Sequence, residues 1–312
     1  MVRLPPAEKL SLAVRKNVRD EWSNTQADLE KQLSSILGEA WTVDINPNAI
    51  WPYHNEGYAK ESLGSCIKAY VEGVIYQLNY LSGRYSNLVE EINNICHAHV
   101  LTLDVEESKP PRFSYGGCDV QDGRLRVLFV EKNLGTNIND CCSEGVLFPA
   151  LNNAPGEKPL SFSARIGIKA EYEDQINGTR HQIAELLGKA DDEVTLDPNF
   201  EETHAKLAAA KKVKGSGIRD DWQGALGSYT ASYFEALASH MKYINVGDDE
   251  LVQEGFLEAV DKVKIVFRIV DTLKHSSYCE VEIDDGVLYL QCTAERWGTN
   301  ISGVASKLMD IL

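Results

Sequence analysis

The sequence predicts an α+β protein built from two copies of one folding unit. Short motifs recur at a constant spacing, and each copy shows the same order of helix-like and strand-like segments. A register shared over this distance indicates a tandem duplication. The recurring motifs, each displaced by 163 residues, are Leu63-Gly64-Ser65 with Leu226-Gly227-Ser228, Asp122-Gly123 with Asp285-Gly286, and Gly135-Thr136-Asn137-Ile138 with Gly298-Thr299-Asn300-Ile301.

In the first copy we expect helix, strand, two helices, three strands and helix. Helical apolar spacing predicts a helix over 8–37 ended by Gly38, and β-rich alternation predicts a strand at 41–45. Residues 63–81 are apolar nearly all the way round, which is typical of a buried central helix. Asp122-Gly123 predicts a tight hairpin turn because both residues tolerate positive φ. The other expected elements are a helix at 85–96, strands at 99–105, 113–120 and 124–130, and a helix from Gly135 to about Leu151.

The second copy repeats this order after a turn-rich segment without periodicity. We therefore expect a first module at 1–152, a linker at 153–160 and a second module at 161–312. The second copy has about 12 more residues before its central helix, since Asn48 to Leu63 is 15 residues and Asn199 to Leu226 is 27. Its expected elements are helices at 162–188, 225–244, 249–260 and 300–311, with strands at 193–196, 262–271, 277–283 and 287–293.

This element order predicts that each module folds as a four-stranded, mostly antiparallel sheet with helices. Two like modules most often pair about a pseudo-two-fold axis, so we expect a pseudo-dimer within the chain. Assembly of several chains into a homo-oligomer is an open alternative.

Charge and composition exclude several classes of partner. The net charge of −16 disfavours nucleic acid and anionic membrane surfaces. The opening residues lack the apolar core of a signal peptide, and no apolar run has the length of a membrane span. Seven cysteines, none repeated between the copies, indicate free thiols in a reducing cytoplasm.

Two segments between the first strand and the central helix are candidates for partner binding. The first copy has an aromatic loop there, and aromatic side chains on loops give large contact areas at little entropic cost. The second copy has a basic, glycine-containing run instead, which could contact an acidic group. The alternatives are that the aromatics seal the core and that the lysines form a solvated loop. The candidate residues are Trp51, Tyr53, His54, Tyr58, Lys211, Lys212 and Lys214.

The repeated Gly-Thr-Asn motif is a candidate anion-binding site. If it opens a helix, the free amides there could hold a phosphate or carboxylate. Capping of the helix explains the same residues without any ligand. The residues concerned are Gly135, Thr136, Asn137, Gly298, Thr299 and Asn300.

Reactive chemistry would belong to the first copy alone. Cys66 is expected just inside a helix N-terminus, where the dipole can lower a thiol pKa, and His54 is a candidate partner. His97 and His99 would share one face of a strand and could bind a metal, although further ligands are not specified. Burial of the thiol and a structural role for the histidines are the alternatives, and no cofactor is expected.

Both copies therefore keep residues that build a fold, while no catalytic set is complete in either. The leading hypothesis is a cytoplasmic, non-catalytic binding protein whose two modules form a composite surface or cleft for a protein or a small ligand. The alternative is an enzyme with one active site in the first copy that uses cysteine and histidine.

Overall fold

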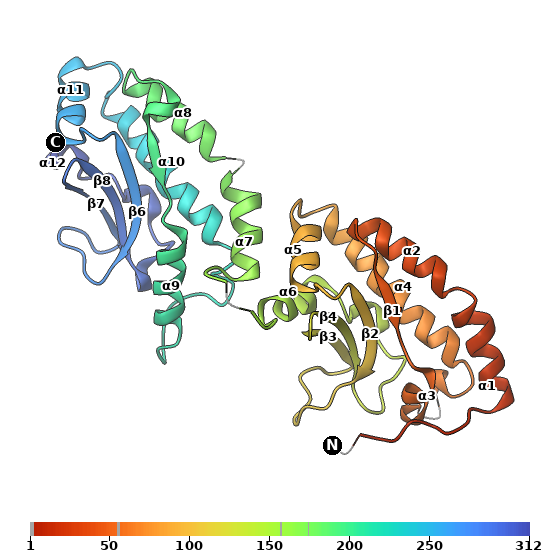
Figure 1. Cartoon of the computed structure of the whole chain (residues 1–312). Coiled ribbons are helices and arrows are strands. Elements are labelled where there is room, and N and C mark those ends of the chain that lie inside the picture. Colours follow the sequence, from red (N-terminus) through yellow and green to blue (C-terminus); the bar gives the residue numbers. More distant parts are fainter. Residues whose placement is uncertain (1–2, 55–56, 157, 174) are drawn as a thin grey trace. The chain divides into compact units, whose positions relative to one another are not determined.

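The computed structural model describes residues 3–54, 57–156, 158–173 and 175–312. The chain divides into two compact units, Met1–Glu157 and Lys158–Leu312 (Figure 1). Each unit contains helices and one four-stranded mixed sheet, so the fold is α+β as the sequence predicts.

The two sheets have the same strand order. It is β1-β2-β4-β3 in the first unit and β5-β6-β8-β7 in the second. In each sheet the first two pairings are parallel, and only the hairpin pairing is antiparallel. The strands are β1 (Thr42–Asp44), β2 (Val100–Val105), β3 (Gly116–Gln121), β4 (Arg124–Phe129), β5 (Thr195–Asp197), β6 (Lys264–Val270), β7 (Cys279–Asp284) and β8 (Val287–Thr293).

The expectation of mostly antiparallel sheets is therefore wrong. Helices connect β1 to β2, and such a crossover makes the two strands parallel. The connection 106–115 then leads to β3, which does not pair with β2. The hairpin places β4 between them, where it pairs with β2 on one side and with β3 on the other. The hairpin turn itself is confirmed, since Asp122 and Gly123 have φ of 52° and 68°.

Most expected helices are present, but four of them are divided. The expected helix 8–37 consists of α1 (Leu12–Asn17), a π-helical turn (Val18–Ser23) and α2 (Gln26–Leu37), which ends at left-handed Gly38. A π-helical turn at Lys169–Glu173 divides its counterpart in the second unit. The expected helix from Gly135 is a short 3₁₀ turn followed by α6, and the expected helix at 300–311 is likewise a 3₁₀ turn followed by α12. The other helices are α3 (Pro47–Ile50), α4 (Leu63–Ser82), α5 (Leu88–Ile95), α6 (Glu144–Asn152), α7 (Phe162–Ile168), α8 (Ile176–Leu186), α9 (Phe200–Lys211), α10 (Leu226–Tyr243), α11 (Glu250–Ala259) and α12 (Leu308–Ile311).

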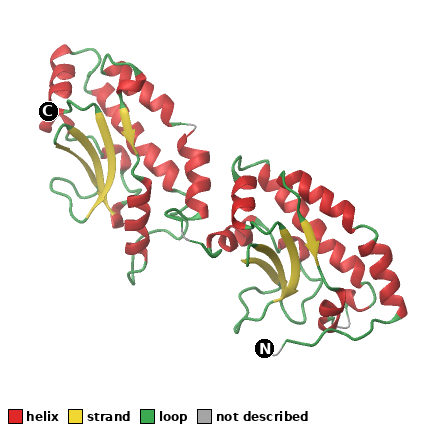
Figure 2. Cartoon of the chain, viewed as in Figure 1, coloured by secondary structure: helices red, strands yellow, loops and turns green. Residues whose placement is uncertain are grey.

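Each sheet has one face covered by helices (Figure 2). Buried residues alternate with more exposed ones along β2, which is the pattern of a strand with one covered face. The central helices α4 and α10 each contribute many buried apolar side chains. In the second unit, residues of α10, β6 and β8 belong to one apolar core. The other face of each sheet carries polar side chains.

Glycine lets each central helix touch the first helix of its unit at the backbone. A Cβ on Gly64 would lie 2.5 Å from the carbonyl oxygen of Asn17 and 2.7 Å from the Cα of Val18. A Cβ on Gly227 would lie 2.4 Å from the carbonyl oxygen of Gly167. The repeated Leu-Gly-Ser motif therefore marks a helix crossing that is too close for any side chain.

No helix within the described residues is long and apolar enough to cross a membrane.

The close crossing makes a prediction about stability. Gly64→Ala and Gly227→Ala should each lower the free energy of unfolding by about 1–3 kcal/mol, because the added methyl forces two backbones apart. Gly255→Ala in α11 is the matched control, since a Cβ there meets nothing within 4 Å. It should raise the stability by about 0.5–1 kcal/mol through helix propensity. Urea denaturation measures all three, and equal effects at the three positions would contradict the crossing.

A buried hydroxyl makes a second prediction. Thr230 in α10 is fully buried, and its Oγ1 has no hydrogen-bond partner among the described residues. The residue at the corresponding place in α4 is the buried Ile67. Thr230→Val should therefore raise the free energy of unfolding by about 1 kcal/mol, because the unpaired hydroxyl disappears at nearly constant volume. Thr230→Ser keeps the hydroxyl, loses the methyl and should destabilise. A valine variant less stable than the parent chain would refute this account.

Candidate functional site

A row of polar side chains crosses the first sheet, one from each strand. The register aligns Asp44 of β1, Thr102 of β2, Arg126 of β4 and Asp119 of β3. Paired residues of neighbouring strands project from the same face of a sheet, so the four side chains share one face. Their neighbours along β2 and β4 are buried apolar residues, which leaves the polar row on the face away from the helices.

Asp119 is the centre of an ion-pair cluster at one end of this row. Arg126 donates from Nε and Nη2 to the two carboxylate oxygens of Asp119, both at 2.8 Å. Arg112, from the connection 106–115, donates to Asp119 at 2.8 Å and to the buried Glu106 at 2.7 and 2.9 Å. Burial alone raises the pKa of Asp119, but the bonds from Arg126 and Arg112 outweigh it and hold that pKa below its usual value. The carboxylate is therefore ionised at neutral pH and fixes both arginines.

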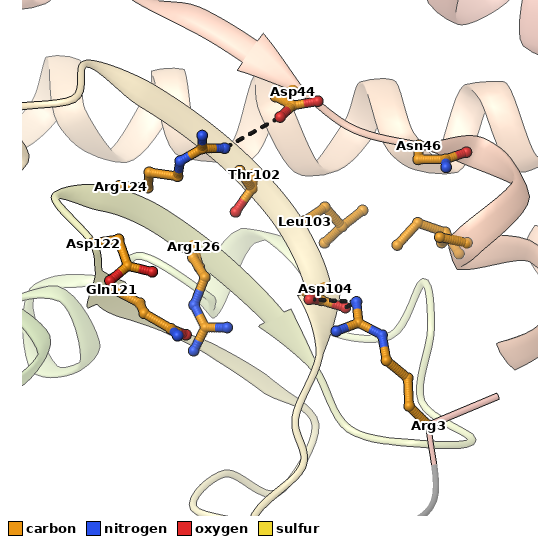
Figure 3. A pocket seen from close by; sticks show the side chains of 12 residues that line it. Arg3, Asp44, Asn46, Thr102, Leu103, Asp104, Gln121, Asp122, Arg124 and Arg126 are labelled. Atoms are coloured by element: carbon orange, nitrogen blue, oxygen red, sulfur yellow. Dashed lines mark hydrogen bonds and ion pairs between the residues drawn. The ribbon is translucent and has the colours of Figure 1, made fainter. Parts of the chain in front are cut away.

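Beside this cluster the open face contains a polar hollow of about 360 Å³ (Figure 3). Two further ion pairs cross it. Arg124 donates from Nη1 to Asp44 at 3.2 Å, and Arg3 from the N-terminal segment donates to both oxygens of Asp104 at 2.6 and 2.7 Å. Residues of the segment that follows β1, among them Asn46, complete the rim. The hollow therefore presents alternating positive and negative groups on a rigid sheet.

The hydroxyl of Thr102 lies on the floor of the hollow, between Arg124 and Arg126 (Figure 3). Its Oγ1 is buried and has no hydrogen-bond partner among the residues that the structure describes. Buried polar atoms are normally paired, and an exception at the floor of a hollow is a place where a ligand could supply the partner.

The second unit has a corresponding hollow with other chemistry. Its row is Asp197, Val266, Tyr289 and Glu282, so acidic residues again stand at both ends. The hollow measures about 470 Å³ and is bordered by α9. Its arginine, Arg268, comes from β6. The guanidinium carbon of Arg268 lies 3.8 Å from the centre of the Tyr289 ring, and its Nη2 donates to Glu282 at 2.9 Å.

The aromatic residues predicted to bind a partner occupy different environments. Tyr53 is buried, packs against Phe129 and accepts a hydrogen bond from the amide of Leu4, so its side chain belongs to the core. Trp51 and His54 are half-buried with ring centres 4.4 Å apart, and Tyr58 is exposed. Residues 55 and 56 of this loop lie outside the described part of the chain.

The predicted basic run follows the end of α9. Lys211 is held by the carbonyl of Ile218 at 2.5 Å and by Asp220 at 2.7 Å. Lys212 and Lys214 are exposed. Of this run, Lys211 is thus bound within its own loop, whereas Lys212 and Lys214 are open to solvent.

The repeated Gly-Thr-Asn motif does not open a long helix, which corrects the expected helix and removes the helix N-terminus on which the expected anion sites depend. The motif precedes three-residue 3₁₀ turns at Ile138–Asp140 and Ile301–Gly303. Its glycines have left-handed φ of 86° and 78°, and their amides donate to the buried hydroxyls of Tyr70 and Tyr233 at 3.0 and 3.2 Å. The motif therefore anchors a connection to the central helix. This applies to Gly135, Thr136, Asn137, Gly298, Thr299 and Asn300 alike.

The cysteine candidate is buried, and the paired histidine candidates make packing contacts of their own. Cys66 is fully buried, and burial raises its pKa to about 12. His97 and His99 precede β2 instead of lying on it: the His97 ring lies against Gly123, and His99 has a φ of 51° and stacks on Trp41. Within the described residues, no three His, Cys, Asp or Glu side chains are grouped to hold a metal.

The residues of the hollow were not singled out from the sequence. One local signal was available, because Arg124 and Arg126 alternate with apolar residues and must share a face of their strand. Asp44 and Thr102 join them only through strand pairing.

No family model, curated protein or solved structure matches this chain.

The environment of Cys66 makes a prediction about reactivity. In the native protein at pH 8, iodoacetamide should label Cys66 more than about 100-fold more slowly than a cysteine in an unfolded peptide, because both its raised pKa and its burial oppose attack. Mass spectrometry of the digest measures this, and urea-unfolded protein is the control in which Cys66 should react fully. Rapid labelling of the native protein would favour the enzyme hypothesis instead.

Proposed function

We propose that this chain is a non-catalytic binding protein made of two related modules, each of which binds through the open face of its sheet. The partner of such a surface is a small polar ligand or a polar segment of another protein. The proposal keeps the hypothesis drawn from the sequence but places the site on the sheets.

A duplicated origin is supported by equivalent contacts in the two units. Strand order, the two-residue hairpin turn and the glycine crossing recur in both. So do the bonds from Tyr70 and Tyr233 to the following glycines. These shared residues maintain the frame, and apart from Asp122 of the first hairpin turn they do not line the two hollows.

The binding proposal rests on the position of the segment in which the two units differ. The segment between the first strand and the central helix contains the four-residue α3 in one unit and the longer α9 in the other. In both cases this segment borders the hollow, with Asn46 and Ala49 in the first unit and Glu202 and Lys206 in the second. Variable segments on a constant scaffold are the usual location of binding specificity.

The chemistry of the first hollow suits recognition better than catalysis. Arg124 pairs with Asp44 and Arg3 pairs with Asp104, and complementary charges held in place on a surface are suited to recognising a polar partner. The enzyme alternative depends on Cys66 and His54, and the raised pKa of Cys66 counts against it. A pseudo-dimer with a shared cleft, a homo-oligomer and a cytoplasmic location stay predictions.

Filling the hollow tests this function. Ligand-detected NMR with a library of anionic, cationic, zwitterionic and neutral fragments should find a class that binds, and Ala49→Trp at the rim of the first hollow should remove the part of that binding that belongs to the first unit. Ala40→Trp is the matched control, because Ala40 is exposed and does not line the hollow. Absence of any binding class, or equal binding to both tryptophan variants, would contradict the proposal.

A further inference from the structure

We propose that the hollow of the first unit binds a small dicarboxylate, with one carboxylate on Arg124, the other on Arg126, and the hydroxyl of Thr102 between them. This rests on the proposed function and specifies its ligand class.

The two arginines call for a ligand with two anionic ends, because Arg124 reaches toward Asp44 of β1 and Arg126 toward Asp119 of β3. Arg124 and Arg126 stand two residues apart on β4 and project from the same face, so their Cα atoms are about 7 Å apart. Figure 3 shows them on either side of Thr102, with their guanidinium groups directed apart. A short dicarboxylate such as succinate carries one carboxylate for each arginine, whereas a single carboxylate can satisfy only one of them.

Both guanidinium groups have donors left for a ligand. Within the described residues, Arg126 uses Nε and Nη2 on Asp119, which leaves Nη1. Arg124 uses only Nη1, in a 3.2 Å bond to Asp44. The Asp44 side chain is 70% exposed, and such surface pairs are weak and easily shared. Guanidinium forks match the planar geometry of carboxylates, so these donors favour carboxylate over other polar groups.

Thr102 supplies an independent observation. Its buried Oγ1 lacks a partner in the described structure and lies in register with Arg126. A hydroxyl donates one bond and accepts two, so it can donate to a carboxylate oxygen held by either arginine. Such a ligand would satisfy a group that the fold leaves unpaired.

The acidic groups of the hollow exclude more concentrated negative charge. Asp44, Asp104 and Asp122 also line it, and the whole chain carries −16. A dianionic phosphate would place two charges together beside these carboxylates, whereas a dicarboxylate places one charge on each arginine.

The second unit does not share this site. The residues 163 positions after Arg124 and Arg126 are Val287 and Tyr289. Arg268, the arginine of that face, is already bonded to Glu282 and Gln291 and stacked on Tyr289. One ligand per chain is therefore expected.

Titration of the full chain with succinate, followed by amide NMR, tests the inference. Succinate should shift the amides of Thr102 and Arg126 and saturate at one equivalent. Arg124→Gln and Arg126→Gln should each raise the Kd at least tenfold, since each removes a charge-assisted contact. Thr102→Val should raise it several-fold. Lys264→Gln is the matched control: Lys264 pairs with Asp197 on the second sheet as Arg124 pairs with Asp44, and its loss should leave the Kd unchanged.

Acetate, putrescine and inorganic phosphate are the comparison probes. Acetate should bind at least tenfold more weakly than succinate, and putrescine should not bind. Tighter binding of phosphate, or unchanged affinity in Arg124→Gln, a variant of a half-exposed side chain whose folding is checked by circular dichroism, overturns the inference. If neutral or cationic fragments occupy the hollow and succinate does not, the dicarboxylate assignment fails while the binding function stands. If no probe shifts these amides, both fail.

Discussion

The contact on which both units depend is the backbone crossing between the central helix and the first helix. At Gly64 and Gly227 the two chains touch without an intervening side chain. In the first unit Asn17 also accepts hydrogen bonds from the amides of Gly64 and Ser65, which satisfies donors at the start of α4. The crossing sets how α4 and α10 lie on their sheets. Tyr70 and Tyr233, on these helices, then reach the glycines that anchor the last connection.

Helices cover one face of each sheet, and the side chains on that face are apolar. The other face is open and must be polar instead. There the strands present polar side chains, and charged groups in contact must be neutralised. Both units solve this with acidic residues on the hairpin strand, but the arginine differs in origin. It is Arg126 of β4 beside Asp119 in one unit and Arg268 of β6 beside Glu282 in the other. The frame is shared, and the chemistry of the open face is specific to each unit.

Local signals in the sequence predicted local structure well. The Asp-Gly turns, the left-handed Gly38 and the central helices follow from backbone preferences and apolar spacing within a few residues. The extent of the first helix was less accurate, because the π-helical turns arise next to the crossing, where another helix presses on the backbone. The helix expected to begin at the Gly-Thr-Asn motif failed for a similar reason, because the glycine amide of the motif donates to a tyrosine on another helix.

The sequence by itself determined that the chain has two units of the same element order, which helices are central, and where the hairpins turn. Tertiary structure alone decided that the strands run mostly parallel and that Asp44, Thr102, Arg126 and Asp119 form one row. The physical reason is the range of the interactions. Turn and helix preferences act between neighbours in the chain, whereas strand pairing joins residues that only the folded connections bring together.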